Sequence, residues 1–132
     1  MTQPTDANYQ FFDRYSLVHG ALAVVLQASK VPALPAILGH GVFELGEDAL
    51  KRNIKGIWPD SRPDAIQNHV GDIVSFNAGY VASYALSKSN AGKVALTGFV
   101  MLAAGVWIWN LLQSHSWFSP SPRGTETGAI RR

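Results

Sequence analysis

Three stretches of the chain contain no aspartate, glutamate, lysine or arginine, at residues 15–29, 73–87 and 94–117. The last contains VALTGFVMLAAGVWIWNLLQ, in which Thr97 is the one strongly polar interruption before Asn110. A helix of about 20 residues crosses a hydrocarbon core about 30 Å thick. A soluble helix carries a polar stripe every third or fourth position, and a wholly buried helix requires a larger domain. We therefore predict a transmembrane helix here.

The remaining pattern predicts three further helices, at about residues 12–31, 32–51 and 64–87, before the last one at about 92–113. The second begins with two prolines, which suit the first turn of a helix. Because this segment is also the most polar, we leave open that it is short or re-entrant rather than spanning. The predicted fold class is all-α, an integral membrane bundle of four transmembrane helices.

Small residues recur in the third and fourth predicted helices, including Gly71, Gly79, Gly98 and Gly105. Small side chains let membrane helices approach closely. We predict helix contacts at these positions rather than a nucleotide-binding loop.

The distribution of positive charges gives a second, independent indication of how the four predicted helices are oriented in the membrane, because cytoplasmic loops are enriched in Lys and Arg. Four crossings place the N-terminus, the loop at 51–63 and a C-terminal tail on one side. That side holds eight cations: Arg14, Lys51, Arg52, Lys55, Arg62, Arg123, Arg131 and Arg132. The other holds three: Lys30, Lys88 and Lys93. We predict an inner (plasma) membrane protein with both termini cytoplasmic, a membrane domain at 1–117 and a mobile cytoplasmic tail at 118–132.

Composition narrows the class of protein. The 132 residues suffice for one domain, with 47% hydrophobic residues and 15% charged residues, against about 25% charged in ordinary soluble domains. This excludes disorder, which requires low hydrophobicity and high net charge. The net charge of +2, without basic runs between aromatics, argues against a nucleic-acid partner. The absence of cysteine excludes disulfides, thiolate nucleophiles and iron–sulfur clusters. Mean hydropathy is only +0.05, because polar groups inside the predicted helices offset the apolar spans.

Those internal polar groups are the functional candidates, because an ionisable side chain costs about 2.5–3.5 kcal/mol at the centre of a membrane helix. The second predicted helix carries three on one face: His40, Glu44 and Glu47. The third carries, at a spacing of four, Asp64, Asn68 and Asp72. Both faces flank the loop at 51–63, so a helix hairpin is expected to bring them together. Two secondary candidates are His19, expected to point into the same cavity, and His69 near its entrance.

Three interpretations of these residues remain open. Polar side chains form hydrogen-bonded networks that fix the packing of membrane helices. Carboxylates and histidines on facing helices also hold divalent metals, although the Glu-x-x-His signature of di-metal bundles is absent, since His40 precedes Glu44. Alternatively, Glu44 and Glu47 share a proton or bind a cationic group, in catalysis or transport. No motif assigns a reaction, a metal or a cofactor.

Residues 40–80 read HGVFELGEDALKRNIKGIWPDSRPDAIQNHVGDIVSFNAGY. A Glu near one helix end is followed by a loop with Pro and Arg and then by a D-x-x-x-N-x-x-G helix start, through Glu44, Pro59, Arg62, Asp64, Asn68, Gly71 and Gly79. In this pattern the chain resembles the VanZ-like group of small bacterial membrane proteins and related inner-membrane families. The resemblance implies a multi-helix membrane fold with a shared polar face, and some members are associated with glycopeptide-antibiotic resistance. The chain departs from the pattern in Glu47, where members often have Gln, and in the added Asp72.

We therefore predict a small multi-pass membrane protein of the cell envelope whose intramembrane cavity binds a polar or cationic ligand. Glu44 and Glu47 are the predicted charge-bearing pair, Asp64 and Asn68 the positioning groups, and Asp72 a deeper acceptor. The alternative is a structural accessory subunit of a larger membrane complex, and a third hypothesis is a metal-dependent hydrolase at the membrane surface. Besides the lipid bilayer, the apolar faces favour a membrane protein partner or a homo-oligomer.

Overall fold

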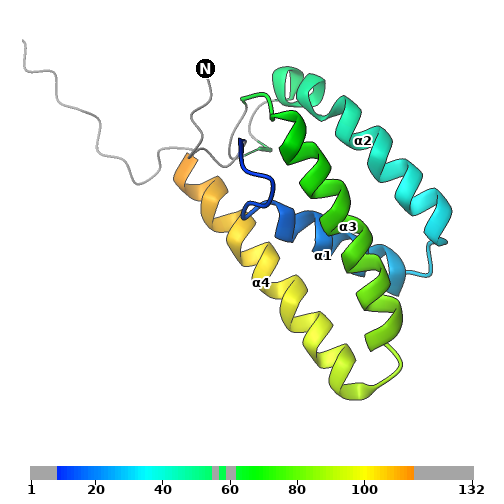
Figure 1. Cartoon of the computed structure of the whole chain (residues 1–132). Helices are drawn as coiled ribbons and strands as arrows, with labels where there is room; N and C mark the ends of the chain where they lie inside the picture. The colour runs from blue at the N-terminus through cyan, green and yellow to red at the C-terminus, as the bar shows by residue number, and fades with distance from the viewer. Residues whose placement is uncertain (1–8, 55–56, 59–61, 115–132) are drawn as a thin grey trace, which may run out of the picture.

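The computed structural model describes residues 9–54, 57–58 and 62–114, and this part of the chain forms four α-helices and no strand. The helices are α1 (Ser16–Ala28), α2 (Ala33–Asn53), α3 (Ile66–Leu86) and α4 (Asn90–Ser114). The all-α prediction is confirmed, and each helix lies within a few residues of its predicted range (Figure 1). Part of the predicted loop at 51–63 and the whole predicted tail at 118–132 lie outside the described residues.

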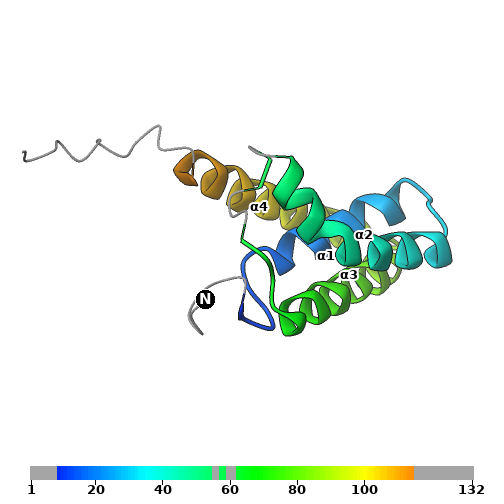
Figure 2. The ribbon, with the colours of Figure 1, turned by 90° about the horizontal axis from the view of Figure 1, so that it is seen from above.

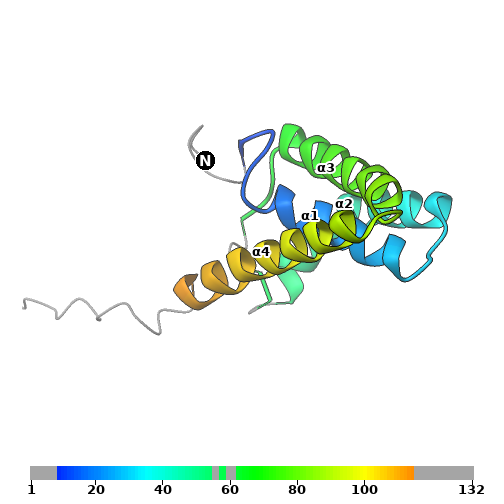
Figure 3. The ribbon, with the colours of Figure 1, turned by 90° about the horizontal axis from the view of Figure 1, so that it is seen from below.

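The helix α1 occupies the middle of the bundle. It packs most extensively along α3, then against α4, and only briefly against α2. In Figure 1 α3 lies in front of α1 while α2 and α4 flank this pair, and Figure 2 agrees from above. Figure 3 shows α3 and α4 diverging from the short turn that joins them. Within the described residues α2 and α4 make no close backbone contact with each other.

Small residues on α3 permit its close approach to α1. Gly71, Ser75, Gly79 and Ser83 recur at every fourth position and so share one helical face. A Cβ atom added at Gly79 would lie 2.4 Å from the carbonyl oxygen of Gly20 and 2.9 Å from its Cα. Backbone atoms cannot yield as a flexible side chain can, so this crossing requires glycine.

The predicted contacts of the small residues are therefore correct on α3 but wrong on part of α4. Among the described residues, no atom outside the helix's own nearby backbone lies within 4 Å of the place where a Cβ would stand at Gly98 or Gly105. Both face outward, because α4 is long and only one side of it reaches α1 and α3.

Both ends of α1 are fixed by specific local interactions. Before the helix, Asp13 Oδ1 accepts hydrogen bonds from the backbone N–H groups of Tyr15 and Ser16, at 2.7 and 2.9 Å. After it, Lys30 adopts a left-handed conformation with φ of 61°, and the Val31 N–H donates to the Leu26 carbonyl at 3.0 Å. This is a Schellman-type helix end.

The result is a helix of 13 residues, about 20 Å long and shorter than a hydrocarbon core of about 30 Å. The short segment is thus α1, whereas α2, for which the sequence leaves a short or re-entrant form open, is one continuous helix of 21 residues.

The helix α4 is the only described helix both long and apolar enough to cross a membrane. Only 6% of its most apolar 18-residue stretch is buried, so it is not the core helix of a soluble domain. The prediction of four spanning helices is therefore only partly supported. The helices α2 and α3 are long enough, but their polar residues lower their hydropathy below that of a typical span.

Buried polar residues are as numerous as buried apolar residues in the described part of this bundle. The buried apolar residues are few and mostly small, with Phe76 as the one large fully buried ring among the described residues. Charged and polar side chains are buried as often: Ser16, His40, Glu44, Glu47, Lys51, Asn68, Asp72 and Ser83. The core of this bundle is therefore largely polar, which is unusual because buried charges are costly unless they are paired.

Candidate functional site

The helix α2 supplies one side of the polar core. His40, Glu44, Glu47 and Lys51 follow one another at spacings of four, three and four, so they share one face, and all four are buried. This face is directed toward α1 and α3. The predicted grouping of the first three residues on one inward face is seen in the structure.

Glu44 lies at the centre of a group of histidines, which we call the histidine cluster (His19, His40, Glu44 and His69). Glu44 Oε1 lies 3.0 Å from His19 Nδ1 and 3.2 Å from His40 Nε2, and these two nitrogens are 2.9 Å apart. On its other side, Glu44 Oε2 lies 3.0 Å from His69 Nδ1. Three helices thus meet at one carboxylate, since His19 comes from α1 and His69 from α3.

Asp72 of α3 lies beside this cluster and connects it to the beginning of α1. Ser16 Oγ donates a hydrogen bond of 2.5 Å to Asp72 Oδ1. The other carboxylate oxygen lies 3.6 Å from His19 Nε2. Asp72 therefore orients His19 from the side opposite Glu44, rather than acting as an isolated deep acceptor.

A second group, which we call the lysine cluster (Glu47, Lys51, Trp58 and Asp64), lies one turn further along α2. Lys51 Nζ lies 3.3 Å from Glu47 Oε1 and forms a short ion pair with Asp64. Trp58 Nε1–H donates to the same Glu47 oxygen at 3.2 Å. Burial raises the pKa of Asp64, and the adjacent Lys51 ammonium opposes that rise.

A cavity of about 330 Å³ adjoins both clusters and is walled by all four helices and the segment at 57–58. Its aromatic walls include Trp58 and Trp107, and its polar wall consists of His19, Glu47, Lys51, Asp64, Asn68 and Asp72. Because α2 and α4 make no close contact, the cavity lies where the bundle is least closed.

The predicted site residues therefore meet, but not in the predicted roles. Glu44 and Glu47 do not form a carboxylate pair, because Glu44 faces histidines while Glu47 faces Lys51. Asn68 Nδ2 donates to the backbone carbonyl of Gln10 at 2.8 Å and ties α3 to the segment before α1, and its side chain bonds no carboxylate of the described residues. Asp64 is held by Lys51.

The sequence reasoning missed Lys51 and Ser16. Lys51 continues the helical face of His40, Glu44 and Glu47, which was the available signal, but it was grouped with the cytoplasmic loop cations. The role of Ser16 could not be predicted from the spacing of polar residues within one helix, because its partner Asp72 lies 56 positions away in the sequence.

Comparison with known proteins assigns nothing to this site. No family model, curated protein or solved structure matches the chain. The resemblance of residues 40–80 to the VanZ-like group therefore gains no support, and the site must be interpreted from its own chemistry.

Proposed function

We propose that the chain is a small multi-pass membrane protein of the cell envelope whose internal cavity binds a polar, cationic ligand. In this proposal all four helices lie within the inner (plasma) membrane, with α1 enclosed by the others, and both termini are cytoplasmic.

The observation that carries the membrane part of the proposal is the inverted surface of α2. On its outer side Leu34, Leu38, Val42 and Leu45 are 68%, 60%, 70% and 89% exposed. On its inner side the charged residues Glu44, Glu47 and Lys51 are buried. Water would favour the reverse arrangement, whereas lipid favours this one, because apolar side chains face the tails and charges pair inside.

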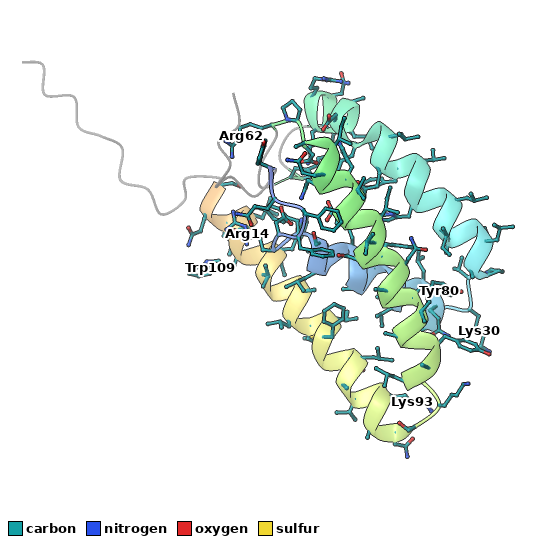
Figure 4. All side chains as sticks on the ribbon, in the orientation of Figure 1. Arg14, Lys30, Arg62, Tyr80, Lys93 and Trp109 are labelled. Atoms are coloured by element: carbon teal, nitrogen blue, oxygen red, sulfur yellow. The ribbon has the colours of Figure 1, made fainter. Side chains whose placement is uncertain are left out.

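The positions of the positive charges support the proposed topology. Figure 4 shows Arg14 and Arg62 toward the end of the bundle where α2 ends and α3 begins, and Lys30 and Lys93 toward the opposite end. Lys51 is buried in the lysine cluster, so it no longer counts as a loop cation. The end with the arginines is the proposed cytoplasmic end.

The cavity chemistry supports a cationic ligand. Its wall contains three carboxylates, those of Glu47, Asp64 and Asp72, beside one ammonium, that of Lys51. Glu47 Oε2 is buried and has no hydrogen-bond partner among the described residues. A ligand N–H group in the cavity would satisfy this oxygen and offset the excess negative charge, while Trp58 and Trp107 contact its apolar part.

We expect the protein to remain in the membrane after alkaline extraction and single cysteines to label according to this topology. The chain contains no cysteine, so each introduced thiol is unique. A membrane-impermeant maleimide added to intact cells should label Ser29→Cys and Ser87→Cys but not Asn53→Cys or Ser114→Cys. Release of the protein into the alkaline supernatant, or equal labelling of all four positions, would contradict the proposal.

The ligand part is tested by calorimetry with ethanolamine as the cationic probe and ethylene glycol as a neutral probe of similar size. We expect ethanolamine to bind more tightly, and Glu47→Gln to weaken it by about 10–100-fold, because a hydrogen bond to a charged group contributes about 1.5–3 kcal/mol. Asp48→Asn is the matched control, since Asp48 lies on α2 outside the cavity wall and the amide oxygen of asparagine can still accept the hydrogen bond from the Asp64 N–H. Absence of binding, or equal weakening by both variants, would contradict a cationic site.

The structural accessory subunit remains the second candidate because of the outer face of α4. Val94, Met101, Leu102 and Trp109 are each at least 60% exposed on this helix. Such a face suits another membrane protein as well as lipid. In that case Glu47→Gln changes only the folded yield, and the purified protein retains a partner subunit.

A further inference from the structure

We propose that His19, His40 and Glu44 form a binding site for a divalent transition-metal ion at the centre of the bundle. The site shares His19 with the cavity wall but differs from the cavity ligand site, because His40 and the carboxylate of Glu44 are not part of that wall. Metal binding can therefore be measured on the purified protein independently of the proposed cavity ligand.

The first argument is the convergence of three ligand atoms. His19 Nδ1, His40 Nε2 and Glu44 Oε1 lie 2.9, 3.0 and 3.2 Å from one another. Zinc binds imidazole nitrogens and carboxylate oxygens at about 2.0–2.2 Å. An ion at that distance from three atoms about 3 Å apart sits slightly outside their plane. This leaves further coordination positions on one side of the ion, as in sites with two histidines and one carboxylate.

The second argument is an unsatisfied buried oxygen. The side chain of Glu44 is only 1% exposed, and its Oε1 atom lies within 3.2 Å of two imidazole nitrogens but receives no well-aligned hydrogen bond from any described residue. Burial of a carboxylate oxygen with incomplete hydrogen bonding is costly. A cation held by the two neighbouring imidazole nitrogens would also bind this oxygen directly.

The third argument is that each ligand is held by an outer contact. His69 Nδ1 lies 3.0 Å from the second oxygen of Glu44, and Asp72 lies 3.6 Å from the far nitrogen of His19. The ring of His40 stacks on Phe76 with centroids 4.0 Å apart. Metal-binding histidines and carboxylates typically have polar outer partners, which fix the orientation of the ligand. Glu44 and His19 have such partners, whereas the ring of His40 is positioned by Phe76 and its Nδ1 atom has no hydrogen-bond partner among the described residues.

Charge balance and ligand type identify the class of ion. Among the buried described residues, the carboxylates of Glu44, Glu47 and Asp72 accompany one ammonium, that of Lys51. A divalent cation reduces this excess of negative charge. Two imidazoles with one carboxylate suit zinc, iron(II), cobalt or manganese, whereas calcium and magnesium prefer oxygen ligands throughout.

The test uses the full chain, purified in detergent, stripped with a chelator and titrated with Co²⁺ and Zn²⁺. We expect one equivalent of Co²⁺ per chain, with a visible d–d spectrum that Zn²⁺ abolishes by competition. His40→Phe keeps a ring against Phe76 but removes the ligand nitrogen, and we expect at least a 100-fold loss of affinity. His19→Gln should behave in the same way, and it provides a second variant if His40→Phe does not fold.

Two further variants separate this site from its neighbours. His69→Gln removes only an outer partner, so we expect a loss of about 10–100-fold. Asn110→Ala alters a polar residue of α4 whose side chain bonds the Val106 carbonyl of its own helix, and it should leave Co²⁺ affinity unchanged. No stoichiometric binding by the wild-type chain means that the histidine cluster is a hydrogen-bonded network only, which overturns the proposal. Unchanged affinity in both His40→Phe and His19→Gln also overturns it.

Discussion

Replacing Lys51 with methionine should destabilise the bundle by about 3–5 kcal/mol, the range measured when one partner of a buried ion pair is removed. Lys51 is 6% exposed and contacts Glu47 Oε1 at 3.3 Å as well as Asp64. Methionine fills similar space but leaves both carboxylates without their cation in the interior. Reversible unfolding in mixed micelles of SDS and a mild detergent measures the free-energy difference.

The adjacent residue provides the matched control. Arg52 is an exposed cation one position further along α2, so Arg52→Met changes the net charge equally without leaving a buried carboxylate unpaired. We expect its effect to stay within about 0.5 kcal/mol. Similar losses from Lys51→Met and Arg52→Met would show that net charge matters and that the buried ion pair does not.

The loss of stability caused by Lys51→Met should also depend on pH. Burial already raises the pKa of Asp64, and removal of the Lys51 ammonium raises it further. When the pKa of a carboxyl group is higher in the folded state than in the unfolded state, the ionised group destabilises the fold at pH values above the folded-state pKa. This destabilisation disappears as the pH falls and the group becomes protonated in both states. The deficit of Lys51→Met should therefore shrink as the pH falls, and it should also shrink in the triple variant with Glu47→Gln and Asp64→Asn. If the triple variant loses as much stability as Lys51→Met, Lys51 stabilises the bundle through packing and not through the ion pair.

The helices could be predicted from the sequence because their signals are local. Charge-free stretches, prolines and the spacing of polar residues act within one helix, and the predicted ranges are close to those of α1 to α4. The same local spacing correctly placed His40, Glu44 and Glu47 on one face of α2, and that face is buried.

The partners across the helices could not be predicted in this way. His19 and His69 were secondary candidates, yet both reach Glu44, because the contact depends on how α1 and α2 each pack against α3. Asn68 lies in the cavity wall, but its amide binds the carbonyl of Gln10, a contact that the sequence pattern did not indicate. Lys51 was assigned to a loop because it lies near the end of its helix.

The crossing of α1 and α3 therefore positions the histidine cluster, and Gly79→Ala should disrupt it. In an exposed helix, replacing glycine with alanine normally stabilises by up to about 1 kcal/mol. Here the added methyl would lie 2.4 Å from the Gly20 carbonyl oxygen and 2.9 Å from its Cα, so the two helices must separate. We expect a loss of about 1–3 kcal/mol, as for overpacked cores, measured by the same unfolding assay.

Gly98→Ala is the control, because the open space around Gly98 on α4 accommodates a methyl group and the substitution should be neutral or stabilising. The two variants make the same chemical change in two helices of the same bundle, so a difference in sign isolates the α1–α3 contact. Separation of these helices also moves His19 of α1 away from Asp72 of α3, which are 3.6 Å apart in the intact bundle. Gly79→Ala should therefore weaken Co²⁺ binding while Gly98→Ala leaves it intact, and equal stability of the two variants would mean that the bundle accommodates the methyl group without moving its helices.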